Sequence, residues 1–171
     1  MMVSIHWEAE ANRFSSLLLV PPPIFRKEAN ASREPKLQEI VRLARRYEVS
    51  KEVLGRAYVD YRAEPVAFVV THNGRILRYF CRKNDFPFIS PRWGDPIPRG
   101  SLLTRKRHEQ SVASEVEETD AAQWFDVSRG NRVPTLFEQV YPQQQGYALI
   151  LLSIESVEED DEDEDRDWNR R

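Results

Sequence analysis

The hydrophobic periodicity of the chain changes from a helical pattern to a strand pattern near Glu64. Before this residue, apolar side chains recur at the i, i+3, i+4, i+7 spacing of one helix face, and after it they alternate as in strands. Because a run of helices followed by a run of strands is typical of segregated layers, the sequence predicts an α+β fold. We expect a helical segment over residues 1–63, a small antiparallel β-rich domain over residues 64–157 and an acidic tail over residues 158–171.

The first predicted helix lies in the stretch "HWEAEANRFSSLLLV". Its apolar face consists of Trp7, Ala11, Phe14 and Leu18, which follow the helical spacing. Proline has no backbone N–H and clashes with the preceding turn, so we expect the triple proline from Pro21 to stop this helix.

Two further helices are predicted as a pair joined by a short turn. The first covers residues 37–47, with Ser32 as its expected cap and Pro35 near its first turn. The second covers residues 53–61 and has Ser50 as its expected cap. The segment from Ser4 to residue 63 therefore reads as helical apart from its turns.

The β-rich segment begins with a predicted hairpin. Asn73-Gly74 lies between two runs of β-branched and aromatic residues, and this dipeptide readily supplies the positive φ angles of a type I′ turn. The proline- and glycine-rich stretch "FPFISPRWGDPIPRG" is expected to be a long loop. Further strands are predicted at residues 111–117, 121–126, 136–141 and 147–154.

Composition excludes several classes of protein. The single cysteine, Cys81, rules out an intrachain disulfide framework and a cysteine-based zinc knuckle, and its place in a strand favours a packing role. No apolar run approaches the length of a membrane span, and no signal peptide is recognisable after Met1. We therefore expect a cytoplasmic protein without a membrane partner.

The acidic tail contains eight consecutive acidic residues, Glu158 to Asp165. Residues 158–171 carry a net charge of −6, so the −3 of the whole chain leaves about +3 on residues 1–157. A like-charged block with few apolar residues cannot bury enough surface to offset its ordering entropy, which predicts disorder. Such a tail either increases solubility or competes with an anionic partner for a basic face.

Candidate metal ligands are few. His6 and Glu10 are four residues apart and share one helix face, but two ligands do not hold zinc. His72 and His108 have no metal-ligand spacing with them. The alternative is that Glu8 and Glu10 are solvated carboxylates near a helix N-terminus.

The turn in "RRYEVSKEVLGRAY" has the sequence features of a helix-turn-helix, and DNA is therefore a candidate partner. The second helix would present Lys51, Glu52, Leu54, Gly55 and Arg56 to a groove, and the first would place Arg42, Arg45 and Arg46 on phosphates. The alternative is an αα-hairpin without a DNA role, because Glu39, Glu48 and Glu52 interrupt the positive surface.

The stretch "EAEANRFSSLLLVPPPIF" closely resembles the ImmA/IrrE family of zinc metallopeptidases, in which E-A-N-x-F-A-x-x-L-L-M-P follows the catalytic H-E-x-x-H helix. Residues 10–15 and 17–21 match this pattern, and Val49-Ser50 matches the family's V-S turn. "GRILRYFCRKNDFPFISPRWGDPIPRGS" and "EQVYPQQQGYALILLS" also resemble the C-terminal part of many members. The resemblance covers residues 5–154.

The chain departs from the family at the active site, because its sequence contains no H-E-x-x-H. In the family, two histidines and a downstream glutamate hold zinc, and the glutamate of the motif is the general base. The resemblance therefore assigns no catalytic residue here. It carries over only Glu10 as the third zinc ligand, with Glu8 as the neighbouring alternative, and Asn12 as a residue supporting the ligands. We expect zinc as the cofactor of the intact family but no tightly bound zinc in this chain.

The resemblance implies a regulator of a helix-turn-helix repressor from a mobile element or a stress regulon. The chain then begins after the catalytic helix, either because its start is misplaced or truncated or because it is a degenerate relative. We expect a catalytically incomplete metallopeptidase relative that retains a repressor-recognition or sensor part. The alternatives are a DNA-binding helix-turn-helix module with a β-rich sensor domain and an interaction protein whose acidic tail makes the contacts.

Overall fold

The computed structural model describes residues 19–82, 85–126 and 134–155. The helices of the N-terminal part are α2 (Pro22–Ala29), α3 (Leu37–Arg46) and α4 (Lys51–Tyr61). The strands are β1 (Val66–His72), β2 (Arg75–Cys81), β3 (Glu117–Thr119), β4 (Leu136–Pro142) and β5 (Tyr147–Ile154). Short helical turns lie between them at α5 (Leu102–Arg105), η1 (Ala121–Gln123) and η3 (Gln144–Gly146). This arrangement confirms the α+β prediction.

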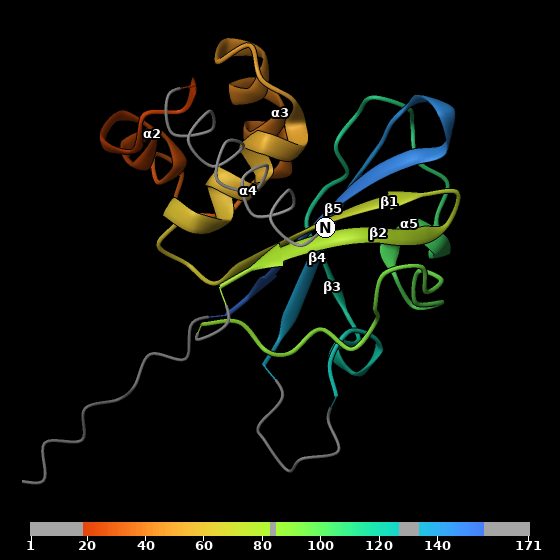
Figure 1. The fold of residues 1–171 in the computed structure, drawn as a ribbon. Coiled ribbons are helices and arrows are strands. Elements are labelled where there is room, and N and C mark those ends of the chain that lie inside the picture. Colours follow the sequence, from red (N-terminus) through yellow and green to blue (C-terminus); the bar gives the residue numbers. More distant parts are fainter. Residues whose placement is uncertain (1–18, 83–84, 127–133, 156–171) are drawn as a thin grey trace, which may run out of the picture.

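The five strands form one antiparallel sheet in the order β2-β1-β5-β4-β3, and α2, α3 and α4 pack on one face of it (Figure 1). Along β1, Phe68 and Val70 contact the helices, whereas Ala67 and Val69 belong to a second core on the other face. Central strands that are buried on both faces explain the nearly continuous apolar runs of β1 and β5.

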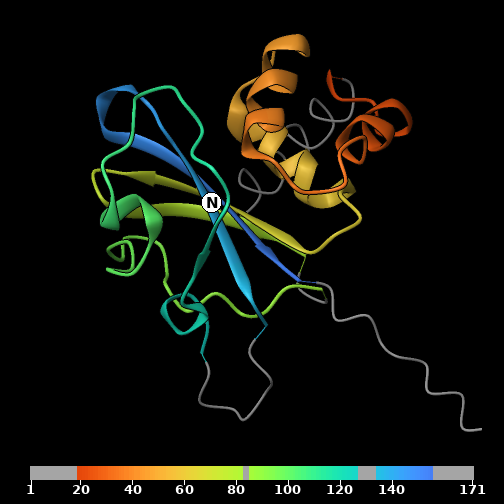
Figure 2. The ribbon, with the colours of Figure 1, turned by 180° about the vertical axis from the view of Figure 1, so that it is seen from behind.

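The second face of the sheet is covered by the long loop after β2, by α5 and by η1 (Figure 2). Phe86, Ile89, Ile97 and Leu102 from this layer are buried against the sheet together with Trp124. Hydrogen bonds from Ser101 Oγ to Glu138 Oε1 (2.5 Å) and from Leu102 N to Glu138 Oε2 (3.0 Å) attach α5 to β4. The loop is therefore a third layer of the fold, as its proline content allows.

Arg62 connects the helices at the base of α4. Its fully buried guanidinium donates to the carbonyl oxygens of Ala29 (2.6 Å) and Arg33 (3.0 Å) and pairs with Glu64 (2.5 Å). A buried charge is tolerated only when it is paired and hydrogen-bonded. Arg62 therefore fixes the end of α2 next to the start of β1.

The hairpin, the α3–α4 pair, β4 and β5 confirm the corresponding sequence predictions. Asn73 and Gly74 have φ angles of 49° and 73°, as a type I′ turn requires. Ser50 caps α4, since its Oγ accepts a hydrogen bond from Val53 N at 3.1 Å. The predicted first helix around residues 5–18 and the acidic tail lie outside the described residues.

Four details differ from the predictions. The prolines after Pro21 lie in the first turn of helix α2, because proline fits the first turn of a helix. Ser32 does not cap α3, which begins at Leu37 with its N–H bonded to the side chain of Gln139. Residues 111–116 are not a strand, and residues 121–123 form a 3₁₀ turn capped by Asp120.

The physical reasons for the two wrong strands are local. Ser111 has a φ of 63°, and the segment bonds to β4 only at isolated positions. Ser111 N donates to Pro142 O, and Ser114 N donates to Val140 O while its Oγ accepts from Val140 N. The regular ladder therefore begins at β3. The Asp120 carboxylate accepts from Ala122 N at 3.0 Å and closes a turn where the residue pattern resembles a strand. Within the described ranges, no helix has the length and apolar character needed to cross a membrane.

Candidate partner-binding groove

A groove of about 810 Å³ lies between the α3–α4 turn and one end of the sheet. Its apolar floor includes Ala44 from α3, Val70 from β1 and Leu149 from β5. Its rim is polar and comes from the turn between the helices, from Arg78 on β2 and from the glutamines between β4 and β5. We call it the turn groove. An apolar floor with a polar rim is typical of binding sites.

The helical wall of the turn groove is the segment Glu48–Glu52. Glu48 adopts a φ of 54°, and Val49 N then donates to Ala44 O at 3.0 Å, which ends α3 in a tight reversal. The Ser50 cap starts α4 directly afterwards. The Val49-Ser50 dipeptide, which matches the V-S turn of the ImmA/IrrE pattern, therefore lies in this wall.

Left-handed backbone is concentrated around the turn groove. In the described part of the chain, the residues other than glycine with positive φ are Glu48, Asn73, Ser111 and Gln145, and all but Asn73 line the groove. Such conformations are uncommon for side-chain-bearing residues and cluster at binding sites. The backbone geometry thus marks the same place as the cavity.

Tyr147 and His72 hold the sheet wall of the groove in place. Their rings are stacked with centroids 4.2 Å apart, and His72 Nε2 lies 3.1 Å from the carbonyl oxygen of Gln145, to which it donates. Tyr147 is still 39% exposed, so part of its ring faces the groove. The wall therefore offers an aromatic contact on a fixed backbone.

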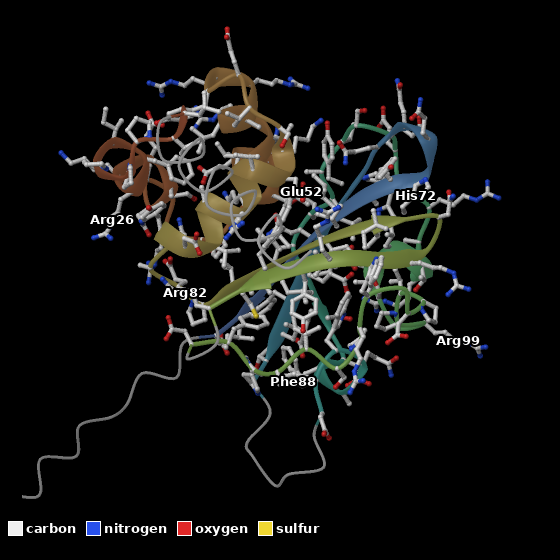
Figure 3. All side chains as sticks on the ribbon, in the orientation of Figure 1. Arg26, Glu52, His72, Arg82, Phe88 and Arg99 are labelled. Carbon is white, nitrogen blue, oxygen red and sulfur yellow. The ribbon has the colours of Figure 1, made fainter. Side chains whose placement is uncertain are left out.

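The charged residues of the rim are Arg45, Lys51, Arg78, Glu48 and Glu52. Arg78 and Glu52 pair at 3.0 Å, and Glu52 lies where α4 faces the sheet (Figure 3). Lys51 Nζ lies 5.7 Å from the centroid of the Tyr141 ring. Arg45 is exposed and makes no ion pair within the described residues. Arg45 and Lys51 are therefore the cations that can bind an acidic group of a partner.

The structure brings together only part of the predicted DNA-contacting set. Arg45 and Lys51 share the turn groove, whereas Arg46 pairs with Glu28 at 2.6 Å and Arg56 lies 5.7 Å from the Phe80 ring. Arg42 is exposed on α3, away from the groove lining.

The predicted presentation of Leu54 and Gly55 to a DNA groove is wrong. Leu54 is fully buried, and Gly55 packs directly against the ring of Phe68 on β1. This face of α4 is buried against the sheet and is not accessible to DNA, as in an αα-hairpin without a DNA role. The helix could contact DNA only through its outer residues.

The predicted metal ligands Glu10, Glu8 and His6, and the supporting Asn12, lie outside the described residues. Among the residues that the structure describes, no group of three histidine, cysteine, aspartate or glutamate side chains could hold a metal ion. His108 bonds through Nε2 to the carbonyl oxygen of Leu102 at 2.8 Å. The described residues therefore do not fit a zinc ion, and no step of the proposed function passes through one.

Sequence reasoning missed the sheet side of the turn groove. The glutamines at residues 143–145, Ser111 and Tyr147 are distant in sequence from the helices they face. The local signal was the "PQQQG" turn, in which Gly146 adopts a φ of 77°. This stretch predicts a turn, but the sequence does not indicate which helix lies next to that turn.

The comparison with protein families agrees with the helical part of this geometry. Residues 6–58 match the family model of Peptidase M78, described as the IrrE N-terminal-like domain. This segment is therefore similar to the ImmA/IrrE family. The match includes α2 and α3 and ends within α4, so it contains the Val49-Ser50 wall of the turn groove but not the sheet wall. No curated protein is significantly similar to the chain.

Proposed function

We propose that this ImmA/IrrE relative binds a helix-turn-helix repressor through the turn groove and thereby regulates it in the cytoplasm. The observation that carries the proposal is the position of the groove, one wall of which belongs to the family-matched segment. The resemblance further implies a repressor of a mobile element or of a stress regulon, and we include this in the proposal.

The groove has the chemistry to bind a protein segment. An apolar side chain of the partner can contact the floor, which is lined by the apolar side chains of Val70 and Leu149. An acidic side chain of the partner, close to that apolar one, can pair with Arg45 or Lys51. This pairing would orient the bound segment and increase its association rate. The amide groups of the glutamines at 143–145 can bond to the partner's backbone.

We further propose that this chain binds its repressor without cleaving it. In the intact family, zinc polarises the scissile carbonyl and lowers the pKa of its bound water. The sequence contains no H-E-x-x-H to hold that ion or to supply the base. Binding alone can still regulate a repressor by holding it away from its operator.

A pairwise two-hybrid panel of the host's helix-turn-helix repressors tests the proposal. The wild-type chain should bind one of them, and the double variant Arg45→Glu with Lys51→Glu should lose this interaction. The matched control is Lys27→Glu with Arg42→Glu, which reverses the same charge on exposed helix positions outside the groove. If no repressor binds, or if both double variants bind equally, the groove is not the repressor site.

Direct binding to operator DNA is the second candidate, because Arg42 and Arg45 are exposed on α3 and make no ion pair within the described residues. A duplex titration monitored by fluorescence anisotropy should then show strong salt dependence. The affinity should fall when both arginines are changed to alanine. Binding that is unaffected by these changes excludes α3 as a DNA-contacting helix.

A further inference from the structure

The loop layer on the far side of the sheet displays a tryptophan in an unusual setting. Trp93 is 80% exposed, although large aromatic side chains normally bury most of their surface. It occupies the centre of the tight turn Arg92–Asp95, in which Arg92 N donates to Asp95 Oδ2 (2.7 Å) and Asp95 N donates to Arg92 O (3.0 Å). Gly94 has a φ of 85°, which favours glycine at this position.

This turn is fixed to the start of β2. Gly94 N donates to Ile76 O at 2.8 Å, Ile76 N donates to Asp95 O at 2.9 Å, and Arg75 Nη1 donates to Gly94 O at 2.8 Å. The backbone of Trp93 is thus held from both sides while its indole remains in solvent. A preordered aromatic loses little conformational entropy when it binds a partner.

Arginines lie on and next to the turn that carries the exposed indole. Arg92 precedes Trp93 in the turn, and the Arg75 side chain on β2 bonds to the carbonyl oxygen of Gly94. Arg99 follows in the same loop and is exposed. Figure 3 shows Arg99 at the end of the sheet that carries His72, away from α2. The carboxylate of Asp95 is already occupied by Arg92 N. The neighbourhood of Trp93 is therefore basic rather than apolar.

We infer that Trp93, Arg75, Arg92 and Arg99 form a binding surface for single-stranded nucleic acid. An aromatic ring among cations is the combination that stacks unpaired bases and contacts phosphates. A protein partner is less suited, because the exposed residues next to Trp93 lack the contiguous apolar patch of a protein interface. Duplex DNA is less suited because its bases are already stacked and a single convex turn does not enter a groove. This surface lies apart from the turn groove and does not depend on the proposed repressor binding.

The test uses the full chain and a labelled oligothymidylate of roughly 12 nucleotides, a length within the usual site size of such surfaces. Fluorescence anisotropy at low ionic strength should show saturable binding. Trp93→Ala should weaken it by about tenfold, the loss expected for one stacked base, and Trp93→Phe should restore most of the affinity. Arg92→Ala combined with Arg99→Ala should weaken binding and reduce the salt slope by about two.

Two controls make the result specific. Phe88→Ala removes another exposed aromatic of the same loop, 69% exposed and apart from Arg99 in Figure 3, and should leave the affinity unchanged. Lys27→Ala, an exposed position on α2 outside both proposed surfaces, should also leave it unchanged. The inference is overturned if the wild-type chain does not bind the oligonucleotide, or if Trp93→Ala and Phe88→Ala change its affinity equally. It is also overturned if a DNA duplex or an anionic lipid vesicle binds with the same affinity as the oligonucleotide and loses that affinity in Trp93→Ala.

Discussion

At the residue scale, α4 packs tightly against the sheet at Gly55. A Cβ added to this residue would overlap the ring of the buried Phe68. Gly55→Ala should therefore destabilise the protein by about 1–3 kcal/mol through overpacking, although alanine is the better helix former by about 1 kcal/mol. Urea unfolding measures this change. Arg42→Ala on exposed α3 is the control and should stay within about 0.5 kcal/mol of the wild type.

Glu138 is a single buried carboxyl group whose ionisation should alter stability. Burial raises the pKa of Glu138, and the hydrogen bonds from Ser101 and Leu102 only partly oppose this shift. Because the folded protein binds this proton more tightly than the unfolded chain, protonated Glu138 adds to the free energy of unfolding. This contribution is complete below the unfolded pKa of 4.5 and is lost as the pH rises through the folded pKa.

The corresponding comparison is between the wild type and Glu138→Gln, which cannot ionise. As the pH falls from about 7.5 to about 5, the unfolding free energy of the wild type should rise relative to that of the variant. Urea midpoints at the two pH values measure the difference. A pH-independent difference would contradict an ionised, buried Glu138.

At the element scale, a sheet residue caps a helix. Gln139 on β4 accepts a hydrogen bond from Leu37 N at 3.0 Å through Oε1 and donates to Pro35 O at 2.9 Å through Nε2. Gln139→Leu keeps a similar volume but leaves both backbone groups unpaired, which should cost about 1–3 kcal/mol. Amide exchange should accelerate at residues 37–40. If only global stability falls and exchange at the start of α3 is unchanged, Gln139 is not its cap.

Local chemistry explains which elements the sequence predicts. The Asn73-Gly74 turn and the Ser50 cap depend on residues adjacent in sequence, and both are observed as predicted. The N–H of Leu37 at the start of α3 is instead bonded by Gln139, 102 residues away, so the prediction of Ser32 as the cap is wrong. The 3₁₀ turn at residues 121–123 depends on one Asp120 hydrogen bond that overrides a strand-like pattern.

At the scale of the whole molecule, the sheet separates two surfaces with different chemistry. The helical side contains the turn groove, whereas the loop side displays the exposed Trp93 directly after Arg92. The sequence indicated Arg45 and Lys51 as possible contacts, but it could not place the 143–145 turn opposite them, because that pairing arises only when β5 lies next to β1. The proline and glycine content predicts the long loop after β2. It does not predict the ordered turn at Arg92–Asp95, which depends on backbone hydrogen bonds to β2.

Metal content is a property of the whole chain as well. The purified 171-residue protein should contain well under one zinc per chain after gel filtration, since the described residues hold no three-ligand group and His6 with Glu10 supplies only two. Elemental analysis by mass spectrometry measures this. Stoichiometric, chelator-removable zinc would show that ligands outside the described residues complete a site.

Isothermal titration of the repressor selected by the two-hybrid panel into the full chain measures binding at the turn groove directly. We expect saturable binding of the intact repressor. The affinity should be at least about tenfold weaker for Arg45→Glu with Lys51→Glu and unchanged for Lys27→Glu with Arg42→Glu. Absence of binding heat, or equal affinity of both double variants, would contradict the assignment of the turn groove as the repressor-binding site.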